Sequence, residues 1–144
     1  MSEVQPTYKR QRFLLAFIRQ LHDSVTATDL QKLVFLYTMK EGCDFYEFIP
    51  YKYGAYSFQL AEDIDILRRD GYLSIESKAG IKIIKATGEY PQESTFRIAS
   101  ERGNDLIRKT YRDYPYYAIN SEITDRLFQG NEAERIKSEK NKYT

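Results

Sequence analysis

The sequence contains no tryptophan, a single cysteine (Cys43) and a single histidine (His22). One cysteine excludes an internal disulfide and a cysteine-rich metal cluster, and one histidine removes most zinc sites and catalytic triads. No window approaches the ~18 apolar residues of a membrane-spanning helix, and the N-terminus MSEVQPTYKRQR lacks the apolar core of a signal peptide. We therefore expect a cytoplasmic chain with no metal, no other cofactor and no membrane association.

The sequence also lacks an excess of charge of either sign. Lys and Arg number 22, Asp and Glu number 21, and the formal net charge is +1. A balanced chain has no overall field that attracts nucleic acid or an anionic membrane, so any basic surface must be local. With 144 residues, of which 42% are hydrophobic, the chain can bury one sizeable core, and one domain is the default expectation.

Aromatic residues are abundant, with 13 Tyr and 8 Phe. Apolar residues recur with helical spacing and predict helices over about residues 8–22, 26–42 and 57–71. The second helix opens at TATDLQ, where either Thr26 with Asp29 or Thr28 with Gln31 resembles a capping box. It is apolar around nearly its whole circumference and should be buried. Ser57 is a candidate N-cap for the third helix.

The periodicity then changes to that of strands. YLSIES, IKIIKAT and STFRIA alternate or are β-branched, and SKAG is a short turn between the first two. Ser100 is a candidate cap for a fourth helix that ends before Pro115, and a short fifth helix should end near Gly130. NEAERIKSEKNKYT indicates a solvated helix extension or linker. We therefore expect a domain over residues 1–130 and a charged linker or tail over 131–144.

This order predicts an α+β, mostly helical fold: a winged helix-turn-helix-like core, a two- or three-stranded antiparallel wing and a C-terminal helical extension. Residues 57–69 would occupy the recognition-helix position. The link before them is longer than the ~3–4 residues of a DNA-binding helix-turn-helix. Between Ser57 and Asp70 there are two arginines and four acidic residues, a net charge of −2, which opposes entry into a DNA groove.

Basic residues concentrate elsewhere. From Lys78 to Arg112 eight Lys and Arg stand against four acidic residues, a net charge of +4. Together with the basic start of the first helix, which is either solvated or meets an anion, this region forms either a mixed solvated face or a phosphate-contacting surface. The candidate nucleic-acid-binding residues are Lys9, Arg10, Arg12, Lys78, Lys82, Lys85 and Arg97.

The stretch YKYGAYS places three tyrosines around Gly54. They can pack a tight corner before the third helix, contact a protein partner, or stack nucleic-acid bases, although Lys52 is the one cation in that loop. Glu62, Asp63 and Asp65 form either a solvated acidic face or an acid/base or metal group, but adjacent helical positions point apart. The candidate partner-binding residues are Tyr51, Lys52, Tyr53, Tyr56, Gln59, Glu62 and Asp63.

The segments LQKLVFLY and FYEFIPYKYGAYSFQLAEDIDIL resemble the winged-helix-like module that begins bacterial proteins whose C-terminal half is the domain of unknown function four-eight-eight. YRDYPYYAINSEI is similar to the segment before that second domain. The resemblance covers about residues 12–130 and implies a non-catalytic module separated from its second domain. More distantly, residues 30–72 resemble the Panacea or SocA-like antitoxin domain, although Ala55 stands where that pattern usually has proline.

Nucleophilic catalysis would have to use Cys43 and His22, and neither stands in a motif that activates it. We therefore expect a non-enzymatic, winged-helix-like regulatory or interaction module. It would bind a protein partner in cis or in trans, in a toxin–antitoxin or defence-type setting, as a monomer or homodimer. The alternative is a DNA-binding transcriptional regulator that uses the basic wing and the helix ends.

Overall fold

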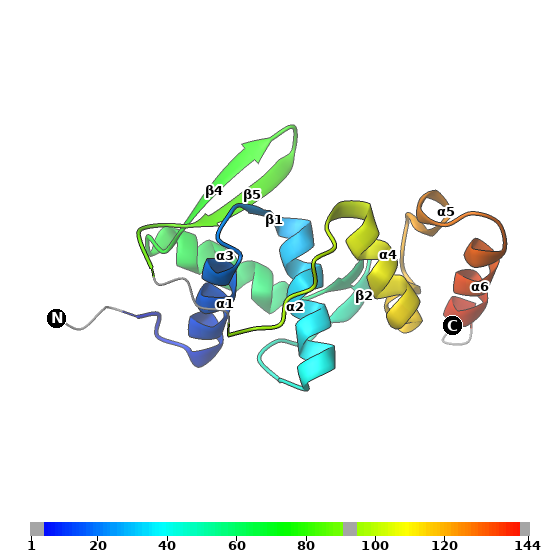
Figure 1. The fold of residues 1–144 in the computed structure, drawn as a ribbon, viewed down its shortest axis with the longest axis horizontal. Helices are drawn as coiled ribbons and strands as arrows, with labels where there is room; N and C mark the ends of the chain where they lie inside the picture. Colours follow the sequence, from blue (N-terminus) through cyan, green and yellow to red (C-terminus); the bar gives the residue numbers. More distant parts are fainter. Residues whose placement is uncertain (1–4, 91–94, 142–144) are drawn as a thin grey trace. The chain divides into compact units, whose positions relative to one another are not determined.

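The three helices predicted in the first half of the chain are present in the computed structural model, which describes residues 5–90 and 95–141. Helix α1 covers Lys9–Gln20, α2 covers Ala27–Glu41 and α3 covers Phe58–Arg69 (Figure 1). The hydroxyl of Thr26 accepts a hydrogen bond from the backbone N–H of Asp29 (3.1 Å), so the first of the two capping registers is the one used.

Two of the three predicted strands are confirmed. Strand β4 covers Leu73–Lys78 and β5 covers Ile81–Ala86, and the two pair antiparallel. Between them Ala79 and Gly80 have φ of 51° and 80°. Positive φ at both central positions is the property of a type I′ turn, whose twist matches that of the flanking strands. SKAG is therefore the short turn that the sequence predicted, and the resulting hairpin follows α3 (Figure 1).

The prediction of a strand at STFRIA is wrong for its described part, residues 95–99; Ser94 lies outside the described residues. Phe96 packs instead against Phe13 and Phe17, with ring centroids 5.4 and 5.6 Å apart. Its backbone N–H donates to Oε1 of Gln20 (2.7 Å), and its carbonyl accepts from Nε2 of the same side chain. Since Gln20 satisfies this backbone, the segment needs no neighbouring strand.

The third strand of the sheet is β1, Val25–Thr26, a two-residue strand between α1 and α2 that the sequence did not reveal. The strand order is β1-β5-β4, with Val25 opposite Ile84 and Ile84 opposite Ile75. A second, two-stranded sheet pairs β2 (Ile49–Tyr51) with β3 (Gly54–Tyr56).

The C-terminal half is helical. Helix α4 covers Gly103–Asp113, a 3-10 helix η1 covers Pro115–Ala118, α5 covers Thr124–Leu127 and α6 covers Gly130–Asn141 (Figure 1). The prediction that Ser100 caps α4 is wrong, because the residue preceding the helix is Arg102, which makes no side-chain cap bond. The fold class is α+β, as predicted. None of the helices within the described ranges combines the length and the apolar character needed to cross a bilayer.

The chain divides into two compact units, one of Met1–Leu30 with Phe58–Ile98 and the other of Gln31–Ser57 with Ala99–Thr144. In the first unit the buried residues come from α1, the start of α2, α3 and the three-stranded sheet; they include Leu14, Phe17, Leu30, Leu60, Leu67 and Ile84. In the second unit a buried cluster joins η1 to α4, α5 and α6; its members are Ile107, Tyr111, Ala118, Ile123, Leu127, Phe128 and Ile136.

This organisation differs from the predicted division into a domain over 1–130 and a tail over 131–144. Ile136, the one large aliphatic residue of the last fourteen, is 1% exposed and belongs to the buried cluster of the second unit. Helix α6 also contacts η1 and α5. Burial of Ile136 thus packs α6 against the core of the second unit, although the composition of this segment is that of a linker.

Candidate functional site

The stretch YKYGAYS contains the turn of the β2–β3 hairpin. This turn combines a positive φ at Gly54 with an exposed side chain at Tyr53. Tyr51 pairs with Gly54, so Lys52 and Tyr53 form a two-residue turn between the strands. Neither turn residue has positive φ, whereas Gly54 has φ +95°. This is the pattern of a type I turn followed by a glycine bulge, which increases the local twist of the hairpin.

Gly54 also makes room for a buried ring. A Cβ atom at position 54 would lie 2.6 Å from Cε1 of Tyr111, closer than a carbon can approach without displacement of the ring. Tyr111 is fully buried, and its hydroxyl donates a hydrogen bond to Oγ of Ser121 (2.6 Å). The absence of a side chain at Gly54 therefore lets the hairpin pack directly on α4, and this contact sets where the turn stands.

Two hydrogen bonds to backbone carbonyls hold the hairpin from the segment after η1. Nδ2 of Asn120 donates to the carbonyl of Pro50 (3.1 Å), and the backbone N–H of Glu122 donates to the carbonyl of Lys52 (2.9 Å). The second bond reaches the turn itself. Because the carbonyls of both β2 and the turn have fixed donors, the conformation of the hairpin is specified by the segment that follows η1.

Helix α2 holds strand β3 and the residue after it, Ser57, through two buried polar side chains. The amide of Gln31 donates to the carbonyl of Ser57 and accepts from its N–H, both at 2.9 Å. Nζ of Lys32 donates to the carbonyl of Ala55 (2.7 Å), although Lys32 is 2% exposed. Sequence reasoning did not select either residue. The available signal was a lysine inside a helix predicted to be buried all round, where a charge needs a partner.

Large side chains nevertheless remain exposed on this fixed framework. Tyr53 at the turn is 48% exposed, Ile49 on β2 is 44% exposed and Tyr116 on η1 is 41% exposed. Helix η1 contacts both β2 and β3, so the three residues stand on neighbouring elements. Lys52 is exposed beside them, and Tyr51 and Tyr56 are half-buried with their rings 5.2 Å apart. We refer to Ile49, Lys52, Tyr53 and Tyr116 as the hairpin surface.

The remaining predicted partner-binding residues lie on α3, in the other unit. Gln59 and Glu62 are exposed, and so is Asp65. Asp63 is 0% exposed, and the expectation that it belongs to a solvated acidic face is wrong. Helical geometry turns position 63 inward toward α1, while positions 62 and 65 point to solvent.

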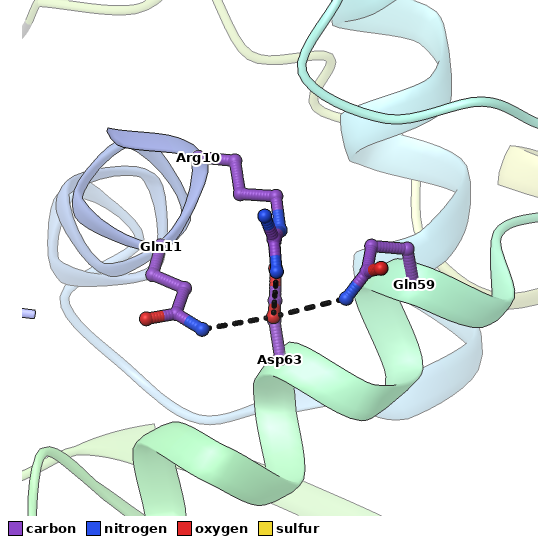
Figure 2. A network of polar contacts seen from close by, with 4 residues as sticks. All are labelled: Arg10, Gln11, Gln59 and Asp63. Atoms are coloured by element: carbon purple, nitrogen blue, oxygen red, sulfur yellow. Dashed lines mark hydrogen bonds and ion pairs between the residues drawn. The ribbon is translucent and has the colours of Figure 1, made fainter. Parts of the chain in front are cut away.

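Asp63 is the centre of a polar network between α1 and α3 (Figure 2). Its Oδ2 accepts from Nε of Arg10 at 2.8 Å, and its Oδ1 accepts from Nε2 of Gln11 at 3.0 Å. Nη2 of Arg10 and Nε2 of Gln59 each lie 3.3 Å from Oδ1. The basic start of α1 thus meets an anion, and for Arg10 that anion is a buried carboxylate of the same chain. Asp63 therefore joins two helices and offers no charge to a partner.

The other candidate nucleic-acid-binding residues are not gathered into one basic face. Lys9 and Arg97 are exposed, whereas Nη1 of Arg12 donates to the carbonyls of Pro6 (3.0 Å) and Thr7 (2.9 Å). On the β4–β5 hairpin, the register places Lys78 and Lys85 on the face that also carries Glu76, and Lys82 on the opposite face, which includes buried Ile84. These three lysines therefore cannot contact the same phosphates together.

Cys43 and His22, the pair considered for catalysis, lie in different units. Sγ of Cys43 is 3.8 Å from Oγ1 of Thr38, and His22 is exposed with φ 61°. Within residues 5–90 and 95–141, no group of three or more His, Cys, Asp or Glu side chains is arranged to hold a metal ion.

Ionisation of the Tyr111 phenol should make the stability of the folded chain depend on pH in the alkaline range. Burial raises the pKa of its phenol from 10.0 to about 12, and the hydrogen bond to Ser121 opposes this rise. The unfolded chain loses this proton near pH 10 and the folded chain near pH 12, so the unfolded state binds fewer protons in that window. The stabilisation is present below pH 10 and falls as pH rises toward 12.

We therefore expect the urea midpoint of the wild type to fall between pH 10 and 11.5 more steeply than that of Tyr111→Phe. The variant is less stable at pH 8, because it loses the bond to Ser121, but it lacks the ionisable phenol. Urea unfolding followed by circular dichroism at a series of pH values measures both slopes. Parallel slopes for the two proteins would show that Tyr111 does not contribute.

The chain was compared with protein-family models, with curated proteins and with solved structures, and none of the three comparisons gave a match.

Proposed function

We propose that this chain is a non-enzymatic, winged-helix-like module that binds a protein partner through the hairpin surface. The observation that carries the proposal is the exposure of Tyr53 and Ile49, together with Tyr116 on η1, around a hairpin whose backbone is fixed by α2, α4 and the segment after η1. Tyrosine is enriched at protein interfaces and loses little conformational entropy on binding. A preorganised framework reduces the cost of association further.

The order of elements supports the winged-helix-like description. Helix α1, strand β1, helix α2, helix α3 and strands β4 and β5 follow one another, and the first strand pairs with the last in the antiparallel sheet β1-β5-β4. The connection between α2 and α3 carries the β2–β3 hairpin instead of the ~3–4-residue turn of a DNA-binding helix-turn-helix. The hairpin thus takes the place of the turn between the second and third helices of such a module.

The charges favour a protein partner over DNA. Arg10 is paired with buried Asp63, and the wing lysines are divided between two faces with Glu76 among them. The exposed side chains of α3 include Glu62 and Asp65, which repel phosphate. The partner we propose presents apolar side chains to Ile49, Tyr53 and Tyr116. It is either a second domain of the same polypeptide or a separate protein, as in the antitoxin-like setting that the sequence resemblance implies.

A photo-crosslinking residue at position 53 tests the proposal in cells, because it links covalently to whatever lies on the turn. The cross-linked protein is then purified and its affinity is measured for the wild type, Tyr53→Ala and Tyr116→Ala. We expect each variant to bind at least about tenfold more weakly, since tyrosine is enriched among the few interface residues whose truncation costs about 2 kcal/mol or more. Their melting temperatures should match that of the wild type, because both side chains are largely solvent-exposed.

Ile81→Ala is the matched control, since Ile81 is 53% exposed on the wing of the other unit. It should bind as the wild type does. The proposal fails if the cross-linked protein binds Tyr53→Ala and Tyr116→Ala as tightly as it binds the wild type.

A further inference from the structure

A hollow of about 320 Å³ lies along α1 in the first unit, and none of its lining residues belongs to the hairpin surface. Its lining comes from the segment before α1, from α1 itself and from the residue before β4; the residues are Gln5, Pro6, Arg12, Leu15, Ala16, Arg19 and Tyr72. This volume is at the lower end of the ~300–1,000 Å³ range of small-molecule sites. The described lining includes two arginines and no acidic residue.

Arg12 and Arg19 are seven residues apart, so they project from the same side of α1 about two turns from one another. Leu15 and Ala16 lie between them on that side. Nη1 of Arg12 donates to the carbonyls of Pro6 and Thr7, at 3.0 and 2.9 Å, which fixes the guanidinium at one end of the hollow. Its remaining N–H donors, on Nε and Nη2, are not used in these bonds.

Arg19 stands at the other end of the hollow, and no acidic side chain is among the described residues that line it. Its Cζ lies 5.5 Å from the centroid of the Tyr90 ring, so an aromatic face positions the guanidinium. Its Nε is buried and has no hydrogen-bond acceptor in the structure as described. A buried donor on a charged group costs free energy while it lacks an acceptor.

Another hollow in the first unit shows that this charge pattern is not general. It has a volume of about 250 Å³, and Asp23 and Glu76 line it together with Lys78 and Lys85. Its cations therefore have acidic neighbours that compensate them. The hollow on α1 differs because its two guanidinium groups face the space without any such neighbour among the described residues that line it.

We propose that the hollow on α1 binds a small oxyanion, a phosphate or carboxylate group, between Arg12 and Arg19. A guanidinium presents paired N–H donors in the geometry that such oxyanions accept, and two of them supply both charge and orientation. Pro6, Leu15 and Ala16 offer apolar surface to the organic part of the ligand. This site goes beyond the proposed protein-binding function, shares no residue with the hairpin surface and can be tested separately.

The test titrates the full chain with inorganic phosphate, and in a parallel arm with succinate, at constant ionic strength maintained with sodium chloride. Two-dimensional NMR follows the backbone amides of α1 and the Nε–H of Arg19. We expect saturable shifts confined to the lining residues, and binding at least about tenfold weaker in Arg12→Gln and in Arg19→Gln, as the loss of a charge-assisted pair predicts. Arg68→Gln, which removes the same charge from an exposed position on α3, should bind as the wild type does.

Saturation by phosphate alone assigns a phosphate-bearing ligand, and saturation by succinate alone assigns a carboxylate; either result supports the site. The proposal is overturned if neither anion gives saturable shifts up to about 20 mM, or if Arg12→Gln and Arg19→Gln respond as strongly as Arg68→Gln, because the response would then be non-specific screening. It is also overturned if the same amides respond only to duplex DNA.

Discussion

Replacing Gly54 with alanine is expected to lower the free energy of unfolding by about 2–5 kcal/mol, because two penalties act at one position. The backbone has φ +95°, a conformation that residues with a Cβ rarely adopt. The new Cβ would also lie 2.6 Å from Cε1 of Tyr111, a ring that is fully buried and cannot move aside freely. Urea unfolding followed by far-ultraviolet circular dichroism measures the loss.

Two further experiments separate the backbone penalty from the steric penalty. Gly42 has φ +70° and no atom within 4 Å of the position of its absent Cβ, so Gly42→Ala should show the backbone penalty alone, about 1–2 kcal/mol. Combining Gly54→Ala with Tyr111→Leu removes the ring edge, and the two changes should then cost less together than the sum of their separate costs. If Gly54→Ala is no less stable than Gly42→Ala, the close approach of Tyr111 does not constrain the hairpin.

Replacing Asp63 with asparagine is the second large effect, with an expected loss of about 2–3 kcal/mol. The carboxylate accepts hydrogen bonds from Arg10, Gln11 and Gln59, whereas the amide that replaces it turns an NH₂ group toward one of these donors. The loss should stay below the ~3–5 kcal/mol of a fully buried ion pair, because the side chain of Arg10 is 29% exposed and regains water.

Glu62→Gln is the matched control, because it makes the same change of charge at the neighbouring, exposed position of α3. It should leave stability within about 0.5 kcal/mol of the wild type. A double-mutant cycle with Arg10→Met then gives the coupling between the two charges. Equal stabilities for Asp63→Asn and Glu62→Gln would mean that the network of Figure 2 does not join α1 to α3.

The pattern of neighbouring residues was sufficient to predict the first three helices and the turn at SKAG. Apolar periodicity predicted α1, α2 and α3, and the hydroxyl of Thr26 caps α2 in one of the two expected registers. The turn at SKAG followed from Ala79 and Gly80 between two alternating runs. In each case the interaction that determines the structure joins residues no more than a few positions apart.

Two predictions from the sequence are wrong because a residue far away in the chain determines the structure. STFRIA alternates as a strand does, but Gln20, 76 residues from Phe96, satisfies its backbone. Asp63 is in an acidic run, but its partner Arg10 is 53 residues away. Exposure of Tyr53 and burial of Tyr111 could not be separated by residue type, because both are tyrosines near glycine or proline turns. Which tyrosine is exposed depends on packing that periodicity does not encode.

The long sequence separations around the hairpin also have a consequence for the order in which the chain folds during synthesis. The first unit has all of its residues once Ile98 has been made. The hairpin is made much earlier, and Gln31 and Lys32 are then available to bind its second strand. Tyr111, Asn120 and Glu122 are not, so the turn acquires its final conformation only after the chain has grown about 70 residues past Pro50. Until that point the turn that carries Tyr53 lacks these contacts, and a partner that requires the finished hairpin surface can bind only after Glu122 has been made.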